Sequence, residues 1–140
     1  MQAANFDETI EKILQRDRRY HRPAYHFVRE SLDHTHKMMG KSDRDAIHHV
    51  TGQELLGGIR AHALEQFGPM TLTVLHEWGV RRCEDFGEIV FNMVESGLLA
   101  KTDNDSRDAF TGGYDFEEAF RRPFLPTRKI SFLEPEPRQV

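Results

Sequence analysis

The chain has 140 residues, of which 38% are hydrophobic and 30% charged, the composition of one ordinary soluble domain. No apolar run approaches the roughly 20 residues of a membrane-spanning helix, and the N-terminus lacks the basic and apolar regions of a signal peptide. A single cysteine, Cys83, excludes an internal disulfide and a zinc site built from several cysteines, so the sequence predicts a cytoplasmic protein.

The first fifty residues predict two helices. A start signal formed by Asn5 and Glu8 precedes apolar side chains at helical spacing. This helix should fray shortly before Pro23, because a proline disfavours the α conformation in the residue that precedes it. Pro23 fits the first turn of a second helix, which Gly40 ends. The polar residues 41–49 predict a loop or a single turn.

The strongest local signal begins a third helix, predicted over residues 51–67. Thr51 and Glu54 have the T-x-x-E spacing of a capping box, in which each side chain bonds the backbone N–H of the other residue. Gly57 and Gly58 lie inside this helix, and each costs roughly 1 kcal/mol of helix stability relative to alanine. Either another element approaches the helix closely at these glycines, or they are simply tolerated.

Two further helices and a β-ribbon are predicted next. The fourth helix covers residues 70–78 and the fifth covers residues 84–96, with a glycine at the end of each. Residues 98–102 and 107–111 predict two strands joined by an acidic turn. Three helices followed by a ribbon are the element order of a winged helix, so residues 51–111 predict a winged-helix-like core.

The predicted fold is therefore mainly α with a small β-ribbon. A single globular domain is expected over residues 1–121, in which an N-terminal helical extension, 1–50, precedes the winged-helix-like core, 51–121. The core should end in a last helical turn at 115–120. Residues 122–140 contain four prolines and predict an extended tail.

The fifth predicted helix is the element that would read DNA in a winged helix, but its charge has the wrong sign. Residues 51–100 contain three Lys/Arg and seven Asp/Glu, a net charge of −4 (3 − 7). The outer face of the helix is predicted to present Glu84, Glu88, Asn92 and Glu95. Carboxylates repel phosphates, so binding of nucleic acid through this face is disfavoured.

A large apolar side chain, Phe91, falls on the same acidic face. An apolar group ringed by charges has the composition of a protein contact site. The leading function is therefore a non-enzymatic protein-interaction module, with the tail ordering on the partner and with contact residues Glu84, Glu88, Phe91 and Glu95. Homodimerisation would use the surface equally well. In the other interpretation, the N-terminal helices or the tail cover Phe91 within the chain.

Two other classes of function stay open. A nucleic-acid-binding regulator would contact phosphates through Arg81, Arg82, Lys101 and Arg107. An enzyme would have a deep pocket with convergent polar groups. The spacing of residues identifies no Ser-His-Asp set, phosphate-binding glycine loop or catalytic carboxylate pair, so no catalytic residue is named.

The eight histidines form no recognisable metal motif. His34 and His36 stand two residues apart on a helix and do not face each other, so they cannot easily chelate one ion. The acidic residues 103–108 resemble the start of a calcium loop, but Asp108 occupies the position that requires glycine. The sequence therefore predicts no metal site and no cofactor.

Three stretches are distinctive: GQELL at 52–56, FGEIVFN at 86–92 and DFEEAF at 115–120. Together with their surroundings they resemble a family of small bacterial proteins of unassigned function, restricted to planctomycete and verrucomicrobial lineages. The likeness covers nearly the whole chain except the tail after Arg122. It implies a free-standing intracellular bacterial domain, and it assigns no activity, cofactor or catalytic residue.

Overall fold

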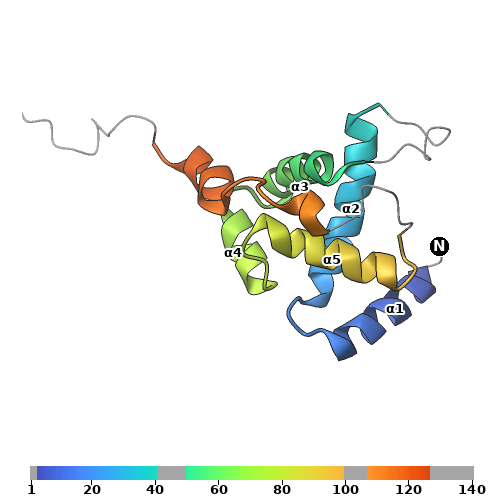
Figure 1. Cartoon of the computed structure of the whole chain (residues 1–140). Coiled ribbons are helices and arrows are strands. Elements are labelled where there is room, and N and C mark those ends of the chain that lie inside the picture. Colours follow the sequence, from blue (N-terminus) through green and yellow to red (C-terminus); the bar gives the residue numbers. More distant parts are fainter. Residues whose placement is uncertain (1–2, 41–49, 100–106, 127–140) are drawn as a thin grey trace, which may run out of the picture.

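The computed structural model describes residues 3–40, 50–99 and 107–126, and the regular structure in these segments is helical throughout (Figure 1). The α-helices are α1 (Ala3–Arg16), α2 (Arg22–Met38), α3 (Gly52–Phe67), α4 (Thr71–Glu77) and α5 (Cys83–Glu95). Four short elements complete the description: the 3₁₀ turns η2 (Gly68–Met70), η3 (Arg107–Phe110) and η5 (Arg122–Phe124), and the π turn η4 (Glu117–Arg121). The five helices predicted from the sequence are confirmed. Among the described segments, none of the helices combines the length and the apolar character that crossing a membrane requires.

The signals that start and end the helices act as predicted. Thr51 Oγ1 accepts a hydrogen bond from the backbone N–H of Glu54 at 3.1 Å, and the Glu54 carboxylate accepts one from the Thr51 N–H at 3.0 Å. This reciprocal pair is the capping box at the start of α3. Pro23 lies in the first turn of α2, and Gly40 follows that helix with a φ of +73°, a conformation that glycine adopts without strain.

The predicted β-ribbon is wrong in the part of the chain that the structure describes. Leu98 and Leu99 form a bend after α5, residues 100–106 lie outside the described segments, and η3 replaces the return strand. Two neighbouring residues of η3, Ala109 and Phe110, explain why a turn forms here and not a strand. A Cβ at Gly52 of α3 would lie 2.7 Å from Ala109 Cβ, and one at Gly87 of α5 would lie 2.9 Å from Phe110 Cβ. A strand sends successive side chains to opposite faces, whereas a tight turn packs both against α3 and α5. The described fold is all-helical and contains no wing, which corrects the winged-helix-like prediction.

The hydrophobic core takes side chains from all five helices. The helix α2 is central and contacts α1, α3 and α5 (Figure 1). Core side chains with almost no exposure are Ile10, Ile13, Tyr25, Val28, Leu56, Ile59, Leu75, Phe86, Ile89, Met93 and Phe120. The helices α1 and α2 therefore belong to the same core as the later helices.

The two glycines inside α3 have different environments. A Cβ at Gly58 would lie only 2.8 Å from Thr35 Cβ of α2, so the missing side chain allows the two helices to approach closely. Thr35 turns its hydroxyl back onto its own helix, where it donates to the Ser31 carbonyl at 2.7 Å. Gly57 faces open space, with nothing within 4 Å of its Cβ position. Close approach therefore explains Gly58, and Gly57 is simply tolerated.

Candidate functional site

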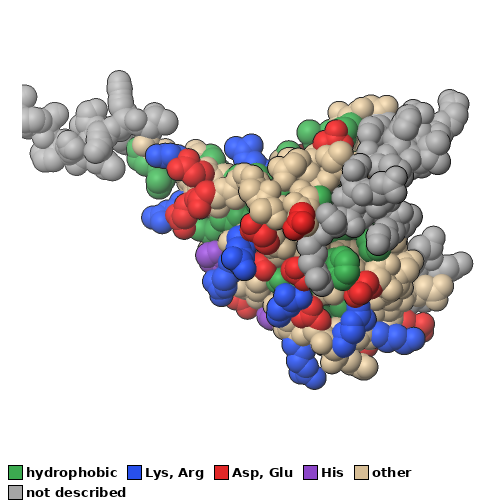
Figure 2. All heavy atoms as spheres, viewed as in Figure 1, with side chains coloured by type: hydrophobic (Ala, Val, Ile, Leu, Met, Phe, Trp, Pro, Cys, Tyr) green, Lys and Arg blue, Asp and Glu red, His purple; other side chains and the backbone are tan. Residues whose placement is uncertain are grey.

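Two of the carboxylates predicted to form a contact face on α5, Glu88 and Glu95, lie beside arginines of the N-terminal region. Arg19 Nη2 lies 3.3 Å from Glu88 Oε1, and Arg16 Nη2 lies 3.8 Å from Glu95 Oε1. Figure 2 shows acidic and basic side chains interspersed over this side of the molecule, where α5 and α1 lie, rather than a patch of one sign. Much of the negative charge of α5 is therefore balanced within the chain.

The outward position predicted for Asn92 is wrong, because this residue is only 6% exposed. Its amide donates to the Tyr25 hydroxyl at 3.0 Å and to Asp17 Oδ2 at 3.0 Å. Asp17 also accepts hydrogen bonds from the Arg19 side chain, the shortest of them 2.7 Å, and these hold the pKa of the Asp17 carboxyl well below its usual range. The connection between α1 and α2 folds over α5, so a helical wheel of α5 alone misplaces this residue.

The other two predicted contact residues, Glu84 and Phe91, are half-buried. Near them, Asp85 accepts hydrogen bonds from the Tyr20 hydroxyl at 2.6 Å and from the backbone N–H groups of Arg81 and Arg82 at 2.8 and 3.2 Å. Asp85 thereby caps the start of α5 and joins it to the connection after α1. The face holds an internal network as well as the residues proposed for partner binding.

The arginines proposed for phosphate contact are only partly placed by the structure. Arg81 and Arg82 are exposed chain neighbours immediately before α5. Arg107 begins η3, and Lys101 lies outside the described residues. Of these four side chains, the structure describes those of Arg81 and Arg82, which are both exposed.

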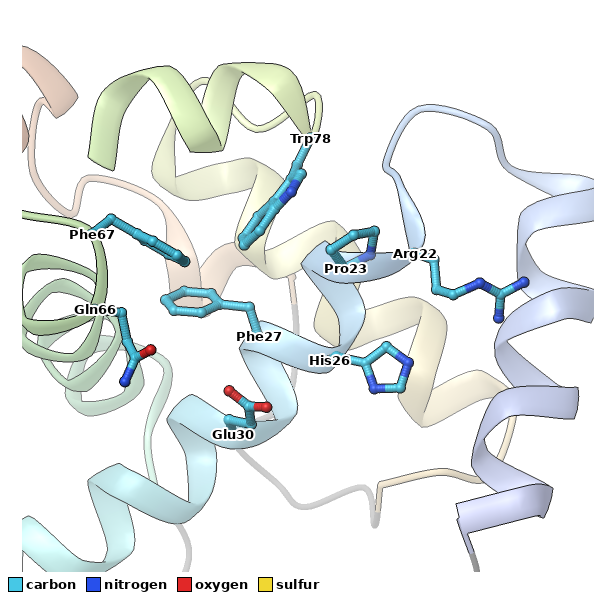
Figure 3. A pocket seen from close by; sticks show the side chains of 8 residues that line it. All are labelled: Arg22, Pro23, His26, Phe27, Glu30, Gln66, Phe67 and Trp78. Atoms are coloured by element: carbon cyan, nitrogen blue, oxygen red, sulfur yellow. The ribbon is translucent and has the colours of Figure 1, made fainter. Parts of the chain in front are cut away.

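A different region holds a pocket of about 350 Å³ between α2, α3 and the end of α4 (Figure 3). Its lining consists of Arg22, Pro23, His26, Phe27, Glu30, Gln66, Phe67 and Trp78. The backbone at the end of α4 is fixed in place, because the Trp78 carbonyl accepts a hydrogen bond from the His21 N–H at 3.1 Å. The pocket thus lies where α2, α3 and the end of α4 meet.

Three aromatic rings form one wall of this pocket. The ring centroids of Phe27, Phe67 and Trp78 lie 5.6 Å apart in each of the three pairs, and Phe67 meets Trp78 edge to face. Rings at that separation contact one another and leave no space for a ligand between them. Phe27 is buried, whereas Phe67 and Trp78 are half-buried, so they supply a partly exposed apolar surface and not an enclosing cage.

The charged groups at the rim of the pocket are unequally compensated. Arg22 points away from the aromatic rings towards α1 (Figure 3), where it pairs with Glu11. His26 Nε2 lies 3.2 Å from Asp7 Oδ1, which also belongs to α1. The Glu30 side chain is 66% exposed, and its ion-pair contact in the described structure is with His62 Nε2 at 3.7 Å, beyond hydrogen-bond range. Glu30 therefore gives the rim a negative character.

Two further sets of chemically capable groups lie elsewhere. Cys83 is buried, with its sulfur 3.3 Å from both the backbone N and the carbonyl O of Tyr114, and burial raises the pKa of its thiol. This is the environment of a structural thiol, not of a nucleophile. His34, His62 and Glu65 each place a potential ligand atom within 4.8 Å of the others, and these three residues could hold a metal ion.

The sequence interpretation named neither the pocket nor the histidine cluster. Phe27, Phe67 and Trp78 lie in the second, third and fourth predicted helices, where their spacing indicates no more than helical faces. Packing of α2 against α3 creates both groups, and no local spacing announces it. The available signal was compositional, namely an aromatic residue at the end of two consecutive helices. Comparisons of the chain with protein-family models, with curated proteins and with solved structures found no match.

Proposed function

We propose that the chain is a cytoplasmic, non-enzymatic interaction module whose pocket between α2, α3 and α4 takes a basic side chain of a polypeptide partner. The observation that carries this proposal is the aromatic wall of Phe27, Phe67 and Trp78 standing beside the exposed Glu30 carboxylate. Proteins recognise a lysine or arginine side chain with these two elements, because its stem is apolar and its tip is cationic.

The rim explains the preference for a cation. Arg22 and His26, the basic groups of the lining, are engaged by carboxylates of α1, and Glu30 has no comparably close basic partner among the described residues. An incoming guanidinium or ammonium would pair with Glu30 while its methylene groups lie on Phe67 and Trp78. A cation over an aromatic face contributes about 0.5–2 kcal/mol, depending on its exposure.

An aromatic centre within a polar rim also fits a protein partner. Hot spots of protein interfaces are enriched in tryptophan and arginine and are surrounded by polar groups that exclude water. The α5 residues Glu84, Glu88, Phe91 and Glu95 stay a possible extension of the contact, but the arginines beside Glu88 and Glu95 make the pocket the better anchor.

The test uses Trp78, which is the only tryptophan in the chain, so intrinsic fluorescence reports directly on the pocket. Peptides selected from a random display library against the full chain should share an arginine or lysine, and they should change Trp78 emission on binding. Replacing that basic residue by norleucine, or Glu30 by glutamine in the protein, should weaken binding about tenfold, as expected for a loss of about 1.4 kcal/mol.

The matched control is Glu8→Gln, which neutralises an exposed glutamate of α1 that does not line the pocket. It should leave peptide affinity unchanged. Selected peptides without a basic residue, or equal losses for Glu8→Gln and Glu30→Gln, would overturn the proposal. An emission change that depends on protein concentration without peptide would instead identify a second copy of the chain as the occupant.

A further inference from the structure

Beside the pocket, the contact between α2 and α3 holds a buried histidine, His62. His62 is 9% exposed, and both of its ring nitrogens are buried without a partner among the residues that the structure describes. Leaving a buried polar group unpaired costs about 1–3 kcal/mol. An apolar residue would avoid that cost, so a role in ligand binding would explain why an imidazole occupies this position.

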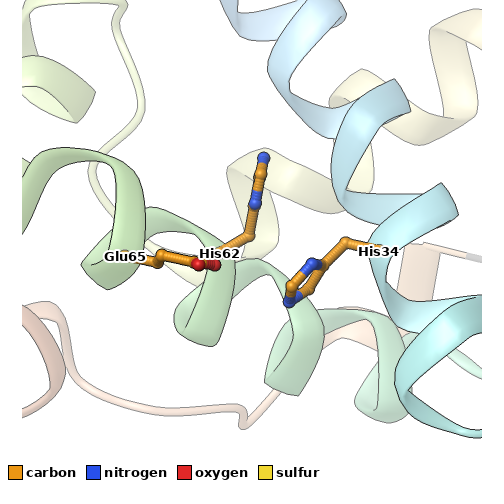
Figure 4. Close-up of side chains that lie close together, drawn as sticks. All are labelled: His34, His62 and Glu65. Atoms are coloured by element: carbon orange, nitrogen blue, oxygen red, sulfur yellow. The ribbon is translucent and has the colours of Figure 1, made fainter.

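Ring packing, not hydrogen bonding, fixes the position of His62. Its imidazole stacks on Phe27 with centroids 5.2 Å apart and an interplanar angle of 17°. Further along α2 it meets the His34 ring, with centroids 4.9 Å apart. Figure 4 shows His34 projecting from α2 towards α3, which carries both His62 and Glu65. Two imidazoles and a carboxylate are thereby gathered from two helices.

We propose that His34, His62 and Glu65 form a binding site for one divalent transition-metal ion of the zinc class. One potential ligand atom from each residue lies within 4.8 Å of the others. Imidazole nitrogens and a carboxylate oxygen are common zinc ligands, and bond lengths near 2.1 Å place tetrahedral ligand atoms about 3.4 Å apart. Closing the remaining gap requires rotation of side chains. His34 is half-buried and Glu65 is exposed, so both have room to rotate around the fixed His62.

Glu30 supplies a second carboxylate next to this cluster. Its Oε1 lies 3.7 Å from His62 Nε2. Metal-bound histidines usually donate their opposite ring N–H to a carboxylate, which orients the ring and increases its basicity. Bound metal would make Glu30 such a partner and would satisfy both nitrogens of His62. The three proposed ligands are not among the residues that line the pocket, whereas Glu30 borders both sites.

The full chain, freed of metal with a chelator, should bind one equivalent of Zn²⁺ in calorimetric titration. Co²⁺ should give the visible absorption bands of a tetrahedral or five-coordinate ion, and Zn²⁺ should raise the melting temperature. Glu65→Gln and His34→Gln should each weaken Zn²⁺ binding at least tenfold. Glu65 is exposed, so its substitution tests the site without a risk to folding.

His36→Gln is the matched control, since it removes a half-buried histidine from the same helix as His34 but outside the cluster. It should bind Zn²⁺ like the unmodified chain. Zn²⁺ affinity that survives both Glu65→Gln and His34→Gln, or that falls equally in His36→Gln, would overturn the proposal. Trp78→Phe should leave Zn²⁺ affinity unchanged, which separates failure of the metal site from failure of the peptide pocket.

Discussion

The side of α2 that faces α5 and the side that faces α3 treat their buried polar groups differently. Towards α5, the Tyr25 hydroxyl and the Asn92 amide bond each other, and Asn92 also reaches Asp17. Towards α3, the Ser31 hydroxyl and both nitrogens of His62 are buried without a hydrogen-bond partner in the described segments. The contrast between the two sides lies in whether their buried polar groups are hydrogen-bonded.

This difference separates polar groups that build the fold from those that are available to a ligand. A completed network rigidifies the contact it spans, and each member loses its partner if another is removed. An incomplete group adds no hydrogen-bond stabilisation to the contact in which it lies. We therefore assign a structural role to the α5 side of α2, and the proposals for peptide and metal binding both lie on the α3 side.

The largest effect is expected where α2 and α3 are closest. Gly58→Ala would force a methyl group against the Thr35 side chain and should lower the free energy of unfolding by about 3 kcal/mol, the upper range for overpacking. Gly57→Ala, on the open side of the same helix, should raise it by up to about 1 kcal/mol. Urea denaturation of the two variants measures both, and equal effects would mean that the close approach is absent.

The next effect compares the two kinds of buried polar group directly. Asn92→Leu deletes the amide that joins Tyr25 to Asp17 and should cost about 2 kcal/mol of unfolding free energy. His62→Leu removes nitrogens without a hydrogen-bond partner among the described residues, and in the presence of a chelator it should stabilise the protein by about 1 kcal/mol. Denaturation curves in matched buffers decide the matter. Destabilisation of similar size by both substitutions would end the distinction drawn between the two sides of α2.

The smallest expected effect is on the stability of the protein at low pH. Hydrogen bonds from Arg19 lower the pKa of Asp17 in the folded chain from its ordinary value of 3.8. A lowered folded-state pKa contributes stability that is complete above the unfolded pKa and is lost as the pH falls below it. Between about pH 5 and pH 3, the unmodified chain should therefore lose about 1 kcal/mol more than Asp17→Asn. Parallel stability curves for the two proteins over that interval would show that the bonds to Asp17 are too weak to matter.

The sequence predicted the helices well because their signals are local. Thr51 with Glu54 marks a helix start by spacing alone, and Gly40 marks an end. The prediction of a β-ribbon was wrong because residues 107–110 take their conformation from packing against Gly52 and Gly87, which are remote in the chain. The outward position predicted for Asn92 was wrong for a related reason, since the turn that buries this residue belongs to the connection after α1.

The candidate site could not be predicted from the same signals. Phe27 belongs to α2, Phe67 to α3 and Trp78 to the end of α4, and their mutual contact exists only after these helices pack. The pairing of His34 with His62 has the same origin. Within α3, His62 and Glu65 stand three residues apart and therefore share a helix face. Two ligands alone do not predict a metal site, and the third, His34, comes from another helix.

The connection between α1 and α2 belongs to both regions at once. Asp17 and Arg19 bond groups of α5, while the His21 N–H holds the carbonyl of Trp78 at the wall of the pocket. Five consecutive residues, 17–21, thus contact both α5 and the end of α4. A substitution that disturbs the backbone of this short segment should therefore alter both the support of the Trp78 backbone and the salt bridge to Glu88 of α5.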